Sequence, residues 1–191
     1  ELNRKSKIEN RKSDAPLRVL FLGQVILRKG IQYLIAVAKA LESENIQFDI
    51  VGPVGISAMA IATAPKNLTF HGRAGRNQAA DWYQRADLFV LPTLSDGFAL
   101  TQLEAMAHGL PVVTTPCCGD VVNDSVDGFV VPPREVEVLV QVFRRYLAEP
   151  ELLPSQSAAA RVKARQFTVH RLAENLRQLE NALKQVNTLK N

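Results

Sequence analysis

Short apolar runs alternate with longer helical patterns over most of this sequence, and that alternation limits the fold more than any other feature. Most of the runs are apolar at consecutive positions, as in parallel strands that are buried on both faces. We expect strands at 19–22, 48–51, 68–70, 88–91, 111–113 and 129–131. The pattern therefore predicts an α/β fold, a Rossmann-like doubly wound parallel sheet with helices on both faces. Ligands of such sheets bind beyond the carboxyl ends of the strands.

The length suits one substantial core but hardly two full domains, since the chain has 191 residues, of which 47% are hydrophobic. That apolar fraction argues against intrinsic disorder, and two cysteines cannot form a disulfide framework. No apolar run approaches the roughly 18–20 residues of a membrane helix, and the polar amino terminus is unlike a signal peptide. We therefore expect a soluble, reduced, cytoplasmic protein.

The net charge lies mostly in the amino-terminal tail. Lys and Arg number 23 and Asp and Glu number 19, so the formal charge is 23 − 19 = +4. Residues 1–18 hold 6 basic and 3 acidic residues, 6 − 3 = +3, which leaves +1 for the rest. The body therefore has little attraction for polyanions, and we expect no nucleic-acid partner. We interpret residues 1–16 as a polar linker or tail.

No strand is expected after about residue 150. Pro150 and Pro154 break the helical pattern, residues 158–160 begin another helix, and Thr168 can cap a final one. The last helix carries an apolar stripe at alternating spacings of four and three: Leu172, Leu176, Leu179, Leu183 and Val186. We divide the chain into a Rossmann-like domain at 17–149 and helices at 150–191, which pack on that domain or on a missing amino-terminal one. A coiled-coil dimer is the alternative for the stripe.

Two loops at the carboxyl ends of expected strands carry the candidate chemistry. The first, residues 23–30, has neither the G-x-G-x-x-G spacing of a dinucleotide site nor the Lys-Ser/Thr pair of a phosphate loop. Its adjacent Arg28 and Lys29 precede a helix and can bind an anion. The second loop leads from Pro92 into a short helix that starts near Phe98. The free N–H groups of that helix would stabilise a diphosphate.

Two acidic residues belong to the second loop and its helix. Asp96 stands before the helix and Glu104 about two turns inside it, so both can border one cleft. The stretch from 91 to 113 resembles the acidic–seven–Glu signature of retaining GT-B glycosyltransferases, in particular the large "group 1" family. The similarity extends over almost the whole chain, with further family-like segments at 23–30, 70–73, 83–92, 127–133 and 167–168. In combination these segments are highly specific.

The resemblance implies a donor site for a nucleotide sugar. Glu104 matches the glutamate that binds the ribose hydroxyls, and Asp96 matches the acidic residue that contacts the donor sugar near the reacting carbon. Lys29, with Arg28, matches the cation on the diphosphate, where it offsets the charge of the leaving group. Asp96, Lys29 and Glu104 are therefore the catalytic candidates. Further donor-binding candidates are Gly23, Gln24, Gly97, the amide-bearing Phe98, Ala99, Leu100 and Thr101, and, beside the nucleobase, Gly72 and Arg73.

Several positions depart from the family pattern. Gln24 stands where the family usually has Arg, Asp96 is shorter than the commoner Glu, and Ala99 replaces Gly. Cys117 and Cys118 stand where many members have a Gly-Gly turn, and we interpret both as small turn residues. These departures are compatible with a nucleotide site and leave the identity of the donor open.

Simpler roles remain open for some of these residues. Asp96 can act as the N-cap of the short helix, and Glu104 can be a solvated residue of an amphipathic helix. His71 is close enough to the expected nucleobase site for a contact, whereas His108, at a helix end, is expected to be structural. Zinc-ligand spacing and an Asp-Xaa-Asp signature are both absent from the sequence. We therefore expect neither a metal nor another cofactor.

The resemblance implies a parent enzyme that transfers a hexosyl group, with retention, from a nucleotide diphosphate sugar to a sugar or lipid acceptor. The acceptor would bind to an amino-terminal domain that precedes residue 1, so the chain alone is expected to be inactive. Peripheral membrane association of the parent protein stays open. Two alternatives remain: a non-catalytic nucleotide-binding or regulatory module, and a GT-B nucleotide-sugar epimerase.

Overall fold

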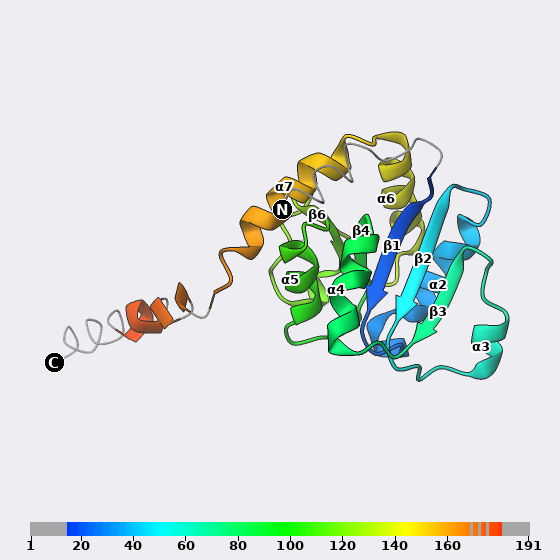
Figure 1. Cartoon of the computed structure of the whole chain (residues 1–191), viewed down its shortest axis with the longest axis horizontal. Helices are drawn as coiled ribbons and strands as arrows, with labels where there is room; N and C mark the ends of the chain where they lie inside the picture. The colour runs from blue at the N-terminus through cyan, green and yellow to red at the C-terminus, as the bar shows by residue number, and fades with distance from the viewer. Residues whose placement is uncertain (1–14, 169, 172, 175, 181–191) are drawn as a thin grey trace.

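The chain folds around one parallel sheet of six strands. The computed structural model describes residues 15–168, 170–171, 173–174 and 176–180 (Figure 1). In the sheet the strand order is β3-β2-β1-β4-β5-β6, and every neighbouring pair is parallel. The order reverses between β1 and β4, which lie side by side in the middle of the sheet. The expected α/β fold with a doubly wound parallel sheet is therefore confirmed.

The strands occupy the apolar runs that the sequence marks. Their bounds are β1 Leu17–Leu22, β2 Ile46–Val51, β3 Leu68–Gly72, β4 Leu88–Leu91, β5 Val112–Thr114 and β6 Gly128–Val130. β4 has the predicted ends, whereas β1 and β2 each begin two residues earlier than predicted. All four residues of β4 are buried, as expected for a central strand covered on both faces.

Helices cover both faces of the sheet. Their bounds are α2 Ile31–Ala40, α3 Ala58–Ala62, α4 Arg76–Arg85, α5 Leu100–Ala107, α6 Val136–Ala148 and α7 Leu152–Ala164, with short 3₁₀ turns η1 Leu27–Lys29 and η2 Pro116–Cys118. α2 packs beside α6, and α5 packs beside α7. On the α6 side, Phe48 of β2 meets Phe143 edge to face at 5.4 Å between ring centroids. Because the strand order reverses after β3, right-handed crossovers place α4 and α5 on the face opposite α2.

The carboxy-terminal helix α7 differs from the sequence expectation. Residues 158–160 do not begin a helix, and Pro154 does not break one, because α7 starts at Leu152 and runs through both. Pro154 lies in the first turn, where a backbone N–H has no intrahelical acceptor and a proline costs little. Leu153 and Ala160 of α7 are buried. This helix therefore packs on the domain, beside α5.

The segment beyond α7 runs away from the sheet over its described residues, 165–168, 170–171, 173–174 and 176–180 (Figure 1). Thr168 caps it as predicted, since its Oγ1 accepts a hydrogen bond from the N–H of Arg171 at 3.2 Å. Of the predicted apolar stripe, Leu176 and Leu179 are 61% and 62% exposed. Leu172, Leu183 and Val186 lie outside the described residues. Within the part of the chain that the structure describes, no helix has the length and apolar character needed to cross a membrane.

One glycine controls how closely two loops approach. Gly30 has a φ of +79°, and a Cβ atom at this position would lie 1.8 Å from the carbonyl oxygen of Pro92. The loop after β1 can therefore lie against the loop after β4 only while residue 30 has no side chain.

We predict that Gly30→Ala lowers the free energy of unfolding by at least about 2 kcal/mol, because the variant combines a left-handed backbone with a backbone clash. Chemical denaturation measures the change. Gly97→Ala is the matched control, since nothing lies within 4 Å of a Cβ added there and its φ is not positive. Equal stability of the two variants would contradict the role given to Gly30.

Candidate functional site

The candidate site lies where the strand order reverses. The loop 23–30 follows β1 and the loop 92–99 follows β4, and these two strands are paired neighbours. Crevices at such reversals are the usual ligand sites of open α/β sheets. The two loops with candidate chemistry are therefore brought together, as the sequence predicts.

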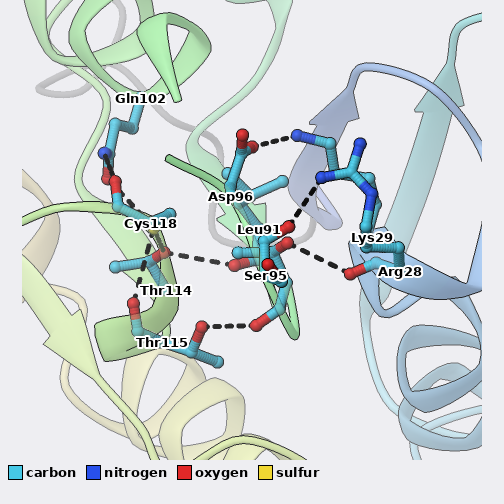
Figure 2. Close-up of polar contacts among 10 residues, drawn as sticks. Arg28, Lys29, Leu91, Ser95, Asp96, Gln102, Thr114, Thr115 and Cys118 are labelled. Atoms are coloured by element: carbon cyan, nitrogen blue, oxygen red, sulfur yellow. Dashed lines mark hydrogen bonds and ion pairs between the residues drawn. The ribbon is translucent and has the colours of Figure 1, made fainter. Parts of the chain in front are cut away.

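Arg28 ties the two loops to each other. Its backbone carbonyl accepts hydrogen bonds from the N–H of Leu94 at 2.9 Å and from the hydroxyl of Thr93 at 3.1 Å. Its guanidinium Nη1 donates to the carbonyl of Ser95 at 2.8 Å (Figure 2). Arg28 therefore joins the loop after β1 to the loop after β4, and its guanidinium is held at the edge of the site by Ser95.

Lys29 and Asp96 form an ion pair between the loops. The Lys29 ammonium donates to Oδ2 of Asp96, and their side chains are 14% and 17% exposed (Figure 2). Water therefore screens this pair less than it screens an ordinary surface pair. The resemblance assigns separate tasks to these two residues, on the diphosphate and on the sugar. In this structure each neutralises the charge of the other.

The helix α5 begins shortly after Asp96 in the chain. It begins at Leu100, two residues later than the sequence suggests, with Ala99 as an N-cap that makes no side-chain hydrogen bond. Asp96 is therefore not the N-cap, and its carboxylate lies on Lys29. Among the described residues, the backbone N–H groups of 98–101 donate no hydrogen bond. An uncapped helix start of this kind favours an anion.

Glu104 lies on the exposed face of α5 and is held by a buried tyrosine. Oε2 of Glu104 accepts a hydrogen bond of 2.8 Å from the hydroxyl of Tyr83 on α4. Burial, followed by the hydrogen bond to Glu104, raises the pKa of Tyr83 far above its usual value. The phenol therefore stays a proton donor to the carboxylate at every working pH. The sequence analysis does not single out Tyr83, although it lies at the start of the family-like segment 83–92.

The turn that holds the two cysteines is hydrogen-bonded to the loop 92–99 and to α5 through its backbone carbonyls. The carbonyl of Cys117 accepts from the N–H of Asp96, and the carbonyl of Cys118 accepts from the side-chain amide of Gln102, both at 2.8 Å. Cys118 is fully buried, with its sulfur 3.0 Å from the hydroxyl of Thr114 (Figure 2). Burial raises the pKa of the Cys118 thiol, so it is not a nucleophile at neutral pH.

The turn expected to border the nucleobase follows β3. Nε2 of His71 lies 2.8 Å from Oδ1 of Asp49, and the imidazole lies against Trp82 at 4.3 Å between ring centroids. Gly72 has a φ of +70°, and Arg73 is exposed. No hydrogen bond or ion pair joins this turn to Lys29, Asp96 or Glu104 in the part of the chain that the structure describes.

The remaining candidates take ordinary places in the two loops. The N–H of Gly23 donates to the carbonyl of Val51 at 2.9 Å, whereas Gln24 and Gly97 are exposed. His108 is the C-cap of α5, and its ring stacks on Tyr83 at 5.1 Å with an interplanar angle of 16°. No group of three or more His, Cys, Asp or Glu side chains that could hold a metal occurs among the described residues.

Comparisons with known proteins show the family of this chain. The family "Glycosyl transferases group 1" matches residues 16–149. A D-inositol 3-phosphate glycosyltransferase of Streptomyces griseus is 37% identical over 100 residues, which are 51% of this chain and 21% of that protein. The chain spans less than half the length of the curated relatives that it matches first.

Two solved structures are similar in fold. One is the carboxy-terminal domain of a group 1 glycosyl transferase, LpcC, from Francisella tularensis, with a TM-score of 0.72 and 19% identity over 87% of this chain and 93% of that one. The other is HepE from Anabaena in complex with UDP, with a TM-score of 0.74 and 18% identity over 95% of this chain and 53% of that one.

The parallel sheet and its strand order define a Rossmann-like α/β domain, the fold that these two solved structures share. The match over residues 16–149 is more specific, and the chain belongs to the glycosyl transferases group 1 family.

The two cysteines should differ sharply in reactivity. Cys117 is partly exposed, whereas Cys118 is buried and its pKa is raised, so we expect a disulfide reagent such as DTNB to label one thiol in the native protein. The second thiol should react only after unfolding in denaturant. Cys117→Ser should abolish the native labelling, and Cys118→Ser should preserve it. Labelling of both thiols at one rate in the native protein would contradict this structure.

Proposed function

We propose that the chain is the donor-binding domain of a hexosyltransferase that uses a nucleotide diphosphate sugar. The observation that carries the proposal is the convergence of Lys29, Asp96 and the uncapped start of α5 at the point where the strand order reverses. The site thus offers a cation and free amides to a diphosphate, and a carboxylate to sugar hydroxyls. The UDP bound to the similar protein HepE supports the same assignment.

Binding of the donor, in this proposal, exchanges the partners of Lys29. The diphosphate carries more charge than one carboxylate, so the ammonium moves to the phosphate oxygens and the N–H groups of 98–101 bind them from the other side. Asp96 is then free to accept hydrogen bonds from the hydroxyls of the sugar. As the bond to the diphosphate breaks, Lys29 and the helix start stabilise the developing negative charge.

The nucleoside would occupy the other end of the site. Glu104 accepts hydrogen bonds from the vicinal ribose hydroxyls, a task that suits a carboxylate because two oxygens face two donors. Gly72 and Arg73 border the nucleobase, and Gly23, Gln24 and Gly97 let the ligand approach the loop backbones. Arg28, anchored on Ser95, adds positive charge at the rim.

The remainder of the reaction would belong to a longer protein. We propose that an amino-terminal domain binds the sugar or lipid acceptor, that transfer proceeds with retention and without a metal, and that the enzyme works in the cytoplasm. The chain by itself would bind the donor without turning it over. Peripheral membrane association would depend on the other domain.

A non-catalytic nucleotide-binding module is the second candidate. Gln24 in place of the usual Arg, and an Asp96 already neutralised by Lys29, favour it. A nucleotide-sugar epimerase on the same fold is a third candidate. A protein that contains the amino-terminal GT-B half would separate them, since a module stays inert with every donor and an epimerase converts the donor sugar without an acceptor.

Isothermal titration of the chain with UDP, GDP and ADP tests donor binding. We expect at least one of the three to bind, and Glu104→Ala to weaken that binding by about 1.5–3 kcal/mol, because the variant loses a charged hydrogen-bond acceptor. Absence of binding to all three at millimolar concentration would overturn the proposal. Unchanged affinity in the variant would remove Glu104 from the site.

Lys29→Met tests the diphosphate contact separately. The variant keeps the aliphatic stem and removes the charge, so the affinity for the nucleoside diphosphate should fall by about 1.5–3 kcal/mol while the affinity for the nucleoside is unchanged. Lys39→Met is the matched control, because Lys39 lies on α2 and pairs with Glu42 at 2.6 Å. An equal loss of affinity for the nucleoside and for the nucleoside diphosphate would mean that Lys29 supports the folded structure and does not contact the diphosphate.

A further inference from the structure

We propose that Tyr83 is a positioning residue that presets the carboxylate of Glu104 for the ribose hydroxyls of the donor. This inference rests on the proposed function. Tyr83 lies on α4, whereas the carboxylate that it positions lies on α5. The direct observation is the hydrogen bond of 2.8 Å from the Tyr83 hydroxyl to Oε2 of Glu104.

The position of the Tyr83 hydroxyl is fixed by packing around its ring. Tyr83 is 2% exposed. Its ring lies 6.1 Å from that of Phe89 on the central strand β4, and it stacks almost parallel on His108 at the end of α5. A ring packed between a central strand and a helix end has little room to change its rotamer. Its hydroxyl therefore points to one place.

Glu104 is the partner whose side chain would otherwise be free to change its rotamer. It lies on the exposed side of α5, and a solvent-exposed glutamate can rotate about three side-chain bonds. The hydrogen bond from Tyr83 selects one of these rotamers before any ligand arrives. Because the phenol occupies Oε2, the other oxygen and the remaining lone pairs stay available for a diol.

The arrangement lowers the cost of binding through preorganisation. Ordering a flexible side chain on binding costs conformational entropy, and that cost disappears when the side chain is already held. The hydroxyl also lies 3.4 Å from the carbonyl oxygen of Thr101, a longer contact than the one to Glu104. The same phenol therefore contacts the first turn of α5. Tyr83 thus contacts both the carboxylate that would bind the pentose and the helix start that would bind the diphosphate.

Tyr83→Phe tests this, because it retains the ring and removes only the hydroxyl. The probes are the nucleoside diphosphate that the wild type binds best among UDP, GDP and ADP, and its 2′,3′-dideoxy counterpart. We expect the variant to bind the ribose ligand about fivefold to tenfold more weakly, as for loss of one hydrogen bond. Binding of the dideoxy ligand should stay within twofold of the wild-type value.

Two further variants separate positioning from a purely structural role. In the Glu104→Ala background, Tyr83→Phe should cause no additional loss, because there is no carboxylate left to position. Tyr146→Phe is the matched control, since Tyr146 is also fully buried and bonds to Gln156, so it loses a buried hydroxyl without touching α5. Its nucleotide affinity should equal that of the wild type, and thermal unfolding should show that both variants fold.

The possible results each decide the matter. Equal weakening of the ribose and dideoxy ligands, or additive losses in the double variant, overturns the positioning role while leaving donor binding intact. A wild type that binds both ligands equally shows that Glu104 does not bind the pentose, which overturns the inference but not the diphosphate site. A wild type that binds no nucleotide overturns the proposed function itself, and the inference with it.

Discussion

The contact between Gly30 and Pro92 is the constraint on which the site depends. A side chain at residue 30 would overlap the Pro92 carbonyl, so the loop after β1 could not rest on the loop after β4. With the loops in contact, Arg28 bridges them through its carbonyl and its guanidinium. Lys29 follows in the next position and reaches Asp96. The geometry of the polar groups is thus set by backbone packing.

Polar contacts also fix the position of a third loop, the turn after β5, relative to the first two. Thr115 donates to the carbonyl of Thr93 at 2.6 Å, which joins the turn after β5 to the loop after β4. The carbonyls of η2 then hold the amide of Asp96 and the side chain of Gln102. Each of these groups would be costly to leave unpaired in the interior, so the three loops are ordered as a unit.

The sequence predicts the fold better than it predicts the site. Continuous apolar runs such as 88–91 have few alternatives to a buried strand, and β4 has the predicted ends. The end of a helix is decided by finer effects, which is why α5 starts at Leu100 instead of Phe98. The predicted helix break at Pro154 is wrong, because a proline in a first turn looks the same in sequence as one that breaks a helix.

Side-chain partners were the least predictable part of the site. Spacing placed Lys29 and Asp96 on neighbouring loops, but their direct pairing depends on how far those loops approach. The roles given to the donor-site residues rest on the family resemblance and stay predictions. Tyr83 and Glu104 lie on separate helices 21 residues apart, and no local pattern connects them. Only the packing of α4 against β1 and of α5 against β4 brings them together.

The ion pair between Lys29 and Asp96 affects which anions can bind between the two loops. Any anion that approaches Lys29 must first dislodge a tethered carboxylate, which is always present at a high local concentration. A singly charged anion such as chloride gains less from the ammonium than a diphosphate does, because the Coulomb attraction grows with charge. Asp96 is in this sense an internal competitor for Lys29, and it favours a ligand with several anchoring points over a simple anion.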